Sequence, residues 1–471
     1  MLMAKQAKKT ATSGKQKSFT ATVIKPTAAS DEGTPSGVNL DNFFSVMNKT
    51  GACYLFIPCR DFWSARSVTA RVPAVVLRDA NGQPLVDANG KIIKLAANKW
   101  LDKFRPVEAV TWAPGLPLQI QDRLVSKAGW IDRQGVSCFN LYRPPRIKLG
   151  DASKAGPWLD HVHRIYPDDA PHIVKWNAQR VQFPGVKINH ALVLGGAQGI
   201  GKDTLLHPVR YAVGPYNFLE TSPVRMLGRF NPFAQAVILR VNEARDLGEV
   251  NRFDFYDHIK DYCAAPPPTL PVEEKYVPQY YVLNVVGLVI TTNHKTDGIY
   301  LPSDDRRHYV AWSNHVKEDF TEDYWKKLWD FYENEDGCEH VASYLTEYDL
   351  SNFNPNAHPP QTPAWHEIVS VNRAPEDAEL ADLIDKLGNP DTLTLAQLTA
   401  AAEGETVEYL MNRKNWRAIP HRLESCRYVS VPNQDAKDEM WKCDGKRQVI
   451  YVRNDLSPEK RLAAAKKRAK T

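Results

Sequence analysis

The stretch GGAQGIGKDT, residues 195–204, combines glycines and a lysine in a spacing that suits the binding of phosphate groups. The pattern G-x-x-x-x-G-K-[ST] is met by Gly196, Gly201 and Lys202, but Asp203 stands where a hydroxyl-bearing residue normally follows the lysine. Glycines let backbone N–H groups curl around phosphate oxygens, and the lysine reaches the terminal phosphates. We therefore expect a nucleotide such as ATP to bind at one set of residues: Gly196, Gly199, Ile200, Gly201, Lys202, Asp203 and Thr204.

A Mg²⁺ ion would be held beside this loop, and the sequence leaves open which residue holds it. Because the usual hydroxyl is replaced at Asp203, either the Asp203 carboxylate or the Thr204 hydroxyl would ligate the metal. Further along, the apolar run AVILRV (236–241) ends in Asn242 and Glu243. Asn242 would join the metal shell or contact a phosphate, and Glu243 could activate water. The alternative is a strand with an ordinary polar end.

Two later segments carry further candidates for catalysis. The run VGLVITTNH (286–294) places Asn293 at a strand end, where it can bridge a terminal phosphate and the attacking water; a simple strand cap is the alternative. In SDDRRHYV (303–310), Arg306 or Arg307 can reach a phosphate in a neighbouring subunit and stabilise transition-state charge. We expect one of the two arginines to pair instead with Asp304 or Asp305 of its own chain.

The elements that must position these residues alternate between strands and helices. Residues 190–214 predict a strand, a glycine-rich loop and a helix, and residues 234–244, 286–294 and 301–312 predict three more buried strands that end in polar residues. This alternation predicts an α/β fold with a mostly parallel sheet, and such sheets bind ligands at the carboxyl ends of their strands.

Composition indicates a globular protein without membrane spans. The chain has 471 residues, 43% hydrophobic and 24% charged, and no run approaches the ~20 apolar residues that a membrane span needs. The basic start lacks an apolar stretch of the secretory type, and the seven cysteines are scattered without a C-x-x-C pair. These features favour a reducing, cytoplasmic location and argue against a disulfide framework or a structural zinc site.

The chain divides into several segments by composition and periodicity. The hairpin expected over 75–95 carries two Asn-Gly turns. The predicted segments are a disordered basic arm (1–38), a small mixed α+β domain (39–150), a helical collar (151–189), the nucleotide-binding domain (190–352), a linker (353–375), a helix–helix–helix–hairpin unit of the winged-helix type (376–453) and a basic tail (454–471). The basic ends are either solvated tails or auxiliary contacts to a polyanion.

The winged-helix-type unit carries its own candidate interface. We expect helices at 377–387, 394–403 and about 405–425, followed by strands 427–432 and 447–453 around the turn CDGK. The third helix is basic, and its side chains could contact DNA phosphates and base edges; a solvated amphipathic helix or a protein-binding face are the alternatives. The candidate DNA contacts there are Arg413, Lys414, Arg417 and Arg422.

Taken as a series, the motifs GGAQGIGKDT, VILRVNEA, LVITTNH and LPSDDRRHYV resemble those of superfamily 3 DNA helicases, and more narrowly those of phage- and plasmid-type primase–helicases. The segment TLPVEEKY (269–276) resembles the extra motif of that family, in which a hairpin lysine follows the DNA strand; the matching residue is Lys275. The resemblance implies an AAA+-like core, a ring that is a homo-hexamer, and ATP-driven 3′→5′ movement on single-stranded or forked DNA.

The resemblance also implies a setting and partners. It suggests replication of a mobile element in a bacterial host cell, with a separate primase or polymerase as a partner, because no close carboxylate pair suited to a primase is evident upstream of residue 190. The histidines of DHVH (160–163) and His172 do not predict a metal site, since His161 and His163 would point apart on a helix. Two other functions stay open: an ATP-switched DNA-binding initiator or regulator, and, more weakly, a small-molecule kinase.

Overall fold

The computed structural model describes residues 37–47, 52–242, 252–275, 277–295, 298–371, 375–412, 415–416 and 419–470. Within these ranges the chain forms two compact units. One unit contains the chain up to Thr111 together with Leu118–Val125 and Trp130–Leu141, and the other contains the rest. The arm predicted over 1–38 lies almost wholly outside the described residues, as do four candidate site residues: Glu243, Arg413, Lys414 and Arg417.

The first unit is a mixed α+β structure. Four strands form a sheet in the order β3-β2-β1-β6, and Phe43, Tyr54, Val68 and Leu101 are buried together beside it. A second, three-stranded sheet has the order β7-β9-β8. The elements are η1 (Leu40–Asn42), β1 (Phe43–Val46), β2 (Cys53–Phe56), β3 (Asp61–Trp63), α1 (Ala65–Arg71), β4 (Val75–Val76), β5 (Lys94–Leu95), α2 (Ala97–Phe104), β6 (Pro106–Val107), β7 (Ala109–Thr111), β8 (Gln119–Ser126) and β9 (Gly129–Asn140).

The hairpin expected over 75–95 is present in a modified form. β4 pairs with β5 at its base, and the isolated bridges Arg78↔Pro84 and Val86↔Ile92 continue the pairing. Two tight turns occur within it because Asp79 and Asp87 each accept hydrogen bonds from the backbone N–H groups two and four residues later. The segment therefore folds back twice rather than once.

The second unit is built around a five-stranded parallel sheet with the order β11-β12-β15-β10-β16. Two of its inner strands, β10 and β15, are mostly apolar and buried along their whole length, as parallel strands covered on both faces require. The α/β core predicted from the sequence is confirmed. The sheet strands are β10 (Ala191–Gly195), β11 (Phe218–Thr221), β12 (Ile238–Val241), β15 (Gly287–Thr292) and β16 (His308–Trp312).

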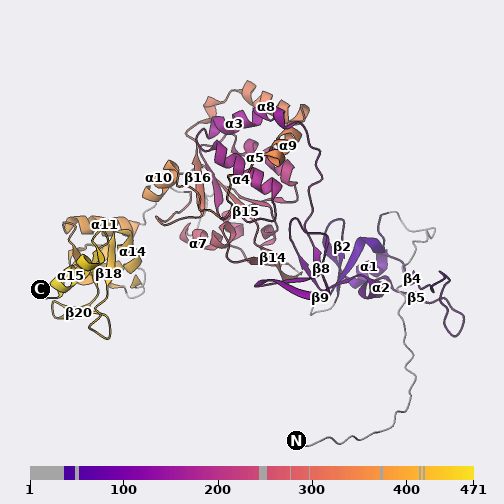
Figure 1. The fold of residues 1–471 in the computed structure, drawn as a ribbon, viewed down its shortest axis with the longest axis horizontal. Coiled ribbons are helices and arrows are strands. Elements are labelled where there is room, and N and C mark those ends of the chain that lie inside the picture. Colours follow the sequence, from indigo (N-terminus) through magenta and orange to yellow (C-terminus); the bar gives the residue numbers. More distant parts are fainter. Residues whose placement is uncertain are drawn as a thin grey trace, which may run out of the picture. The chain divides into compact units, whose positions relative to one another are not determined.

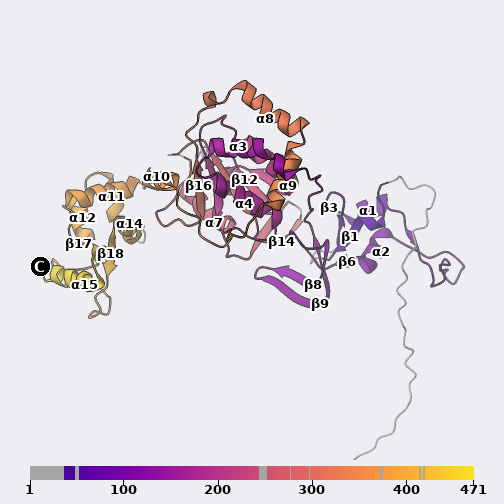
Figure 2. The same ribbon diagram turned by 45° about the horizontal axis from the view of Figure 1, so that its top comes forward.

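Helices α3, α4, α5, α8 and α9 gather beside this sheet (Figure 1), and the turned view in Figure 2 shows α8 as the outermost of them. Arg180 of α4 is fully buried and donates to the carbonyls of Pro184, Val237 and Val285, which ties the predicted collar to the sheet. The further elements are η2 (Ala152–Lys154), α3 (Gly156–Ile165), α4 (Ala170–Gln182), α5 (Lys202–Val213), α6 (Pro223–Met226), η3 (Pro232–Ala234), α7 (Arg252–Cys263), β13 (Thr269–Glu274), β14 (Val277–Leu283), η4 (Lys317–Asp319), α8 (Glu322–Asn334) and α9 (Gly337–Glu347).

The segment 353–375, predicted as a linker, contains helix α10 (Pro363–Val371), so that prediction was wrong in part. Trp365 and Ile368 are buried, and Thr362 donates a hydrogen bond of 2.6 Å to the carbonyl of Val310 in β16. The proline-rich composition led to the linker interpretation, but these two large apolar side chains pack the helix against the sheet.

Residues 375–470 share apolar cores of their own. α11, α12, α13 and α14 enclose Leu383, Leu398, Leu410 and Leu423, and β17, β21 and β18 form a three-stranded sheet. The elements are α11 (Pro375–Lys386), β17 (Thr392–Thr394), α12 (Leu395–Ala401), α13 (Glu405–Met411), α14 (Ile419–Ser425), β18 (Tyr428–Val431), β19 (Trp441–Cys443), β20 (Lys446–Gln448), β21 (Ile450–Arg453) and α15 (Pro458–Ala469).

Two expectations for this part of the chain need correction. The single third helix expected over about 405–425 is divided into α13 and α14, and Asn412 already has an extended backbone. The basic tail expected after residue 453 contains α15, whose Ala465 is buried beside Trp441, Cys443 and Ile450. The run of basic residues hid the small apolar positions that pack this helix. Strands 427–432 and 447–453 do pair, as β18 with β21.

Candidate functional site

Three loops meet at one edge of the parallel sheet. β10 ends at Gly195, β12 at Val241 and β15 at Thr292, and the register pairs Gly195 with Thr292 and Val241 with Ile290. Because all three strands run in the same direction, the residues that follow them come together at the carboxyl edge. A pocket of about 310 Å³ opens there, lined by Gln198, Gly199, Gly201, Lys202, Asp203, Thr204, Arg240, Thr291, Asn293, Trp325 and Trp329.

The glycine-rich loop leads directly into helix α5. Gly196, Gly199 and Gly201 have φ values of +141°, +84° and +94°, a region that suits glycine. At Gly201 a Cβ atom would lie 2.5 Å from His161 and 2.6 Å from Trp325, so a side chain there would clash with both rings. The loop therefore needs these glycines for its path, and the path leaves the first turn of α5 facing the pocket.

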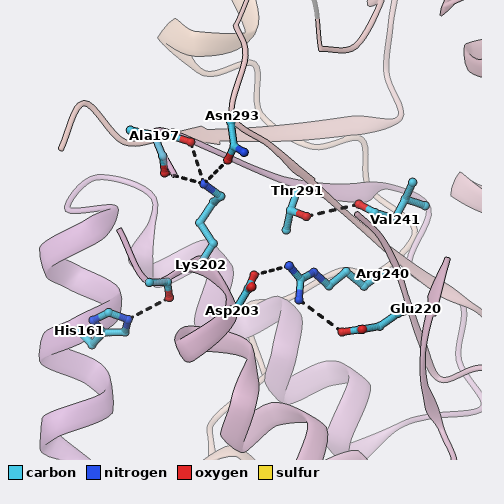
Figure 3. A network of polar contacts seen from close by, with 11 residues as sticks. His161, Ala197, Lys202, Asp203, Glu220, Arg240, Val241, Thr291 and Asn293 are labelled. Carbon is cyan, nitrogen blue, oxygen red and sulfur yellow. Dashed lines mark hydrogen bonds and ion pairs between the residues drawn. The ribbon is translucent and has the colours of Figure 1, made fainter. Parts of the chain in front are cut away.

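Lys202 and Asn293 are in direct contact in this pocket (Figure 3). The Nζ atom of Lys202 donates to Asn293 Oδ1 at 2.8 Å and to the carbonyls of Gly196 and Ala197 at 2.7 and 2.8 Å. Burial, with a smaller contribution from the positive charge of Arg240, lowers the pKa of Lys202 to about 8. An anion placed beside this ammonium would favour its charged form, which makes the site suited to phosphate.

Asp203 pairs with Arg240 of β12, and the same guanidinium contacts Glu220 of β11 at 3.3 Å (Figure 3). The Asp203 side chain is 74% exposed, whereas that of Arg240 is 12% exposed. Asp203 thus faces the solvent side of the pocket with one carboxylate oxygen bound to a cation. A charged residue inside the apolar run VILRV is the sequence signal that could have identified Arg240 as part of the site.

Thr204 and Asn242, the other two candidates for a metal shell, are also near this edge. Thr204 is buried in the first turn of α5 and lines the pocket. The Oδ1 atom of Asn242 is buried and has no hydrogen-bond partner within the described residues, while its backbone N–H donates to Thr221. A buried amide oxygen without a partner is costly unless a ligand contacts it. Asn242 therefore fits a ligand-facing role.

His161 contacts the backbone of the glycine-rich loop, a role that the sequence did not predict. Its Nε2 atom contacts the Gly201 carbonyl at 3.1 Å and its Nδ1 atom contacts the Tyr324 hydroxyl at 2.6 Å. Burial lowers the pKa of His161 to about 4, so the ring is neutral; Nε2 carries the proton because a carbonyl only accepts. Within the described residues no three His, Cys, Asp or Glu side chains form a group that could hold a metal.

Two tryptophans of α8 complete the pocket. Trp325 and Trp329 are half-buried and contribute flat apolar surface to the lining of the pocket. The helix is fixed at its start by Thr321, whose hydroxyl accepts from the backbone N–H of Tyr324. Sequence reasoning did not include these rings, because α8 lies more than a hundred residues after the loop and only the tertiary fold brings them together.

The two candidate arginines lie just before β16. Arg306 is exposed and Arg307 is half-buried, and neither forms an ion pair with a described carboxylate, so the expected pairing with Asp304 or Asp305 was wrong. Asp305 is instead fully buried and paired with His308 at 3.0 Å, while also accepting from Tyr256 and Trp365. The buried carboxylate of Asp305 thus pairs with the side chain that is buried with it.

The candidate DNA contacts are placed only in part. β13 and β14 form an antiparallel hairpin, and Lys275 is exposed at its turn, as the resemblance implied for a hairpin lysine. In α14, Arg422 is half-buried and lies over the ring of Tyr409 at 5.2 Å from its centre. The other three basic candidates of this region fall in the undescribed part of the chain.

No curated protein matches the chain in sequence. A family model described as a family of unknown function (DUF5906) matches residues 194–307, from the end of β10 to the arginine pair. This match covers the glycine-rich loop and the strands that surround the pocket. It is consistent with a common module at the site and attaches no activity to it.

Among solved structures, the apo structure of the NrS-1 C-terminal region is similar at a TM-score of 0.54 and 14% identity, covering 88% of this chain and 96% of that one. A second form of the same region is similar at a TM-score of 0.53 and 13% identity, covering 88% of this chain and 97% of that one. A JCV helicase structure aligns at a TM-score of 0.30 and 12% identity, covering 51% of this chain and 66% of that one. This TM-score is too low to indicate a shared fold. The chain thus shares its fold with the NrS-1 C-terminal region.

Proposed function

We propose that this protein is an ATP-dependent DNA helicase that acts as a ring, with 3′→5′ movement, in the replication of a phage, plasmid or other mobile element. The observation that carries the proposal is the convergence of Lys202 and Asn293 in a pocket at the carboxyl edge of the parallel sheet. The lysine comes from the start of α5 and the asparagine from the end of β15, so a terminal phosphate bound at the loop would contact both.

The nucleotide site has the parts that hydrolysis needs. The loop from Gly196 to Gly201 and the start of α5 direct N–H groups toward phosphate oxygens, and Lys202 supplies a positive charge. Asn293 would orient the water that attacks the terminal phosphate, and Glu243, which lies outside the described residues, would accept its proton. The rings of Trp325 and Trp329 offer a surface on which a nucleobase can stack.

The residues present also fit a Mg²⁺ ion, which prefers oxygen ligands. Asp203 and Thr204 bring a carboxylate and a hydroxyl to the pocket, and Asn242, at the same edge of the sheet, has an amide oxygen without a partner among the described residues. Mg²⁺ bound there would neutralise charge on the phosphate oxygens.

DNA binding and ring formation rest on other parts of the chain. The exposed hairpin turn with Lys275 would follow the phosphates of a single strand, and the basic residues near α14 would add contacts. In a ring, Arg306 or Arg307 would reach the nucleotide of the adjacent subunit. Neither arginine forms an ion pair with a described carboxylate, which is compatible with a contact to the nucleotide of the adjacent subunit.

The central experiment compares Lys202→Ala with Lys326→Ala, an exposed lysine of α8, in ATPase and strand-displacement assays. We expect Lys202→Ala to lose both activities while particle images still show rings, and Lys326→Ala to keep both. Full unwinding by Lys202→Ala would overturn the proposal.

A second experiment separates DNA movement from hydrolysis. Lys275→Ala should keep ATPase activity in the absence of DNA but lose strand displacement, because the hairpin would no longer hold the strand. Equal unwinding by Lys275→Ala and the unmodified protein would remove the hairpin from the mechanism.

An alternative function is an ATP-switched DNA-binding initiator or regulator. The order of helices and strands over 375–453, with β18 paired to β21 after α14, favours it because this arrangement is typical of a winged helix. Preference for an origin-like duplex over a random duplex in a gel shift, without strand displacement at any ATP concentration, would favour this function over the helicase.

A further inference from the structure

The guanidinium of Arg240 connects two carboxylates that come from different elements. Its terminal nitrogens contact Asp203, in the first turn of α5, and Glu220, which is the direct neighbour of Arg240 in the register of β11 and β12. Arg240 stands within the motif VILRVNEA, but the motif pattern gives it no role, and Glu220 lies outside the four motifs. The three side chains form one chain of charges, of which Asp203 and Arg240 line the pocket (Figure 3).

Arg240 is held in place by its strand and its burial. The side chain is 12% exposed, and its Nε atom is buried without a hydrogen-bond partner in the described part of the chain. β12 ends at Val241, so Arg240 stands one residue before the strand end and Asn242 directly follows the strand. The positive charge of Arg240 therefore lies at the same carboxyl edge of the sheet as Asn242, a proposed metal ligand.

At this edge a carboxylate, Asp203, takes the place of the neutral hydroxyl that usually follows the lysine. Its negative charge lies at the start of α5, where it meets Arg240. A divalent cation bound to Asp203 would lie close to that guanidinium, and like charges at such short range repel each other.

We propose that Arg240 competes with the divalent cation for Asp203. With this role, Arg240 neutralises Asp203 and Glu220 until a nucleotide brings its metal, and metal binding then moves the guanidinium off Asp203 while Glu220 keeps its contact. Arg240 is a positioning residue that sets the metal concentration at which the site is filled. The inference rests on the proposed nucleotide-binding function.

The experiment measures the affinity of the full chain for ADP by calorimetry, first in EDTA and then over a series of Mg²⁺ concentrations. The variants are Arg240→Met, which removes the charge at similar length, Arg240→Lys, which keeps the charge but cannot span both carboxylates, and Asp203→Asn, alone and with Arg240→Met. Melting curves identify any variant that does not fold.

We expect Arg240→Met to lower the Mg²⁺ concentration for half-maximal enhancement of ADP binding by about tenfold. Arg240→Lys should lower it by about threefold, which keeps the test decisive if the methionine variant does not fold. In the Asp203→Asn background, Arg240→Met should change this Mg²⁺ concentration by less than about twofold, because the carboxylate for which Arg240 and the metal compete has been removed.

An unchanged or higher Mg²⁺ midpoint in the Arg240 variants would overturn the competition. If the unmodified protein binds ADP but the Arg240 variants show this unchanged or higher midpoint, the proposed function stands and only this inference is lost. Absence of ADP binding with and without Mg²⁺ would overturn the proposed function and the inference together.

Discussion

Lys202 and Asn293, 91 positions apart in the chain, are joined by a hydrogen bond of 2.8 Å at the carboxyl edge of the sheet. The bond connects the helix that follows β10 with the loop that follows β15, and these two strands are neighbours. Any group that binds at the glycine-rich loop therefore meets a cation and an amide at once. This pairing sets the expectations for variants of both residues.

Asn293→Ala should reduce ATP hydrolysis by about 10²-fold, since it removes a polar group that acts on the reacting phosphate and water. ADP affinity should change by less than about tenfold because the loop and Lys202 are intact. Steady-state ATPase and calorimetry measure the two quantities. The control is Asn314→Ala, at an exposed asparagine that follows β16. A loss of the same size in that variant would refute a specific role for Asn293.

Nucleotide affinity should depend on pH through Lys202. Burial lowers its pKa to about 8, so the ammonium form is complete only well below that pH and is lost as the pH rises through about 8. A bound phosphate favours the charged form, and the affinity should fall by up to about tenfold per pH unit above pH 8. Calorimetry between pH 7 and about 9.5 measures this; Lys202→Arg, which stays charged, should flatten the profile if it binds. A flat profile in the unmodified protein would contradict the assignment.

Arg307→Ala is expected to bind ATP normally but to lose about 10³-fold in hydrolysis, because a cation supplied by a neighbouring subunit stabilises transition-state charge. Mixed rings of Arg307→Ala and Lys202→Ala subunits should recover some activity, since one kind of interface then has both residues. Arg306→Ala is the matched comparison and shows which arginine acts. If no mixing ratio restores hydrolysis for either arginine, action between subunits is excluded.

The buried pair of Asp305 and His308 should stabilise the fold over a wide pH range. Burial alone would lower the pKa of His308, but Asp305 outweighs it and raises the pKa to about 10. Burial alone would raise the pKa of Asp305, but His308 and the hydrogen bonds lower it to about 2. The contribution of His308 is complete below its ordinary pKa and is lost as the pH rises through about 10; that of Asp305 is lost as the pH falls through about 2.

Asp305→Asn should therefore cost about 3–5 kcal/mol near neutral pH, because it leaves His308 buried without its counter-ion. Thermal melting measures the loss, which should shrink as the pH rises from about 6.5 to about 10. The control is Asp304→Asn, at the exposed aspartate next to Asp305, which should change the free energy of unfolding by less than about 0.5 kcal/mol. A loss in Asp305→Asn that stayed constant across this pH range would mean that charge is not the cause.

Local patterns in the sequence predicted the glycine-rich loop, the buried strands and the polar residues that follow them. Such features depend on neighbours along the chain. A continuous apolar run predicts a strand covered on both faces, and closely spaced glycines predict a turn because glycine accepts positive φ. The same locality explains the errors. The proline-rich and basic compositions at 353–375 and 454–471 obscured α10 and α15, whose few apolar residues find their partners only in the folded protein.

Contacts between distant segments were decided by the tertiary structure alone. The sequence placed Asp203 beside Lys202, but only the fold brings Arg240 to that carboxylate, and only the register of β11 and β12 brings Glu220 to Arg240. Likewise, only the packing of α3 and α8 places His161 and Trp325 against Gly201. The types and spacing of residues determine which chemistry is possible. Strand order and helix packing decide which charges meet, because Coulomb forces and steric contacts act through space and not along the chain.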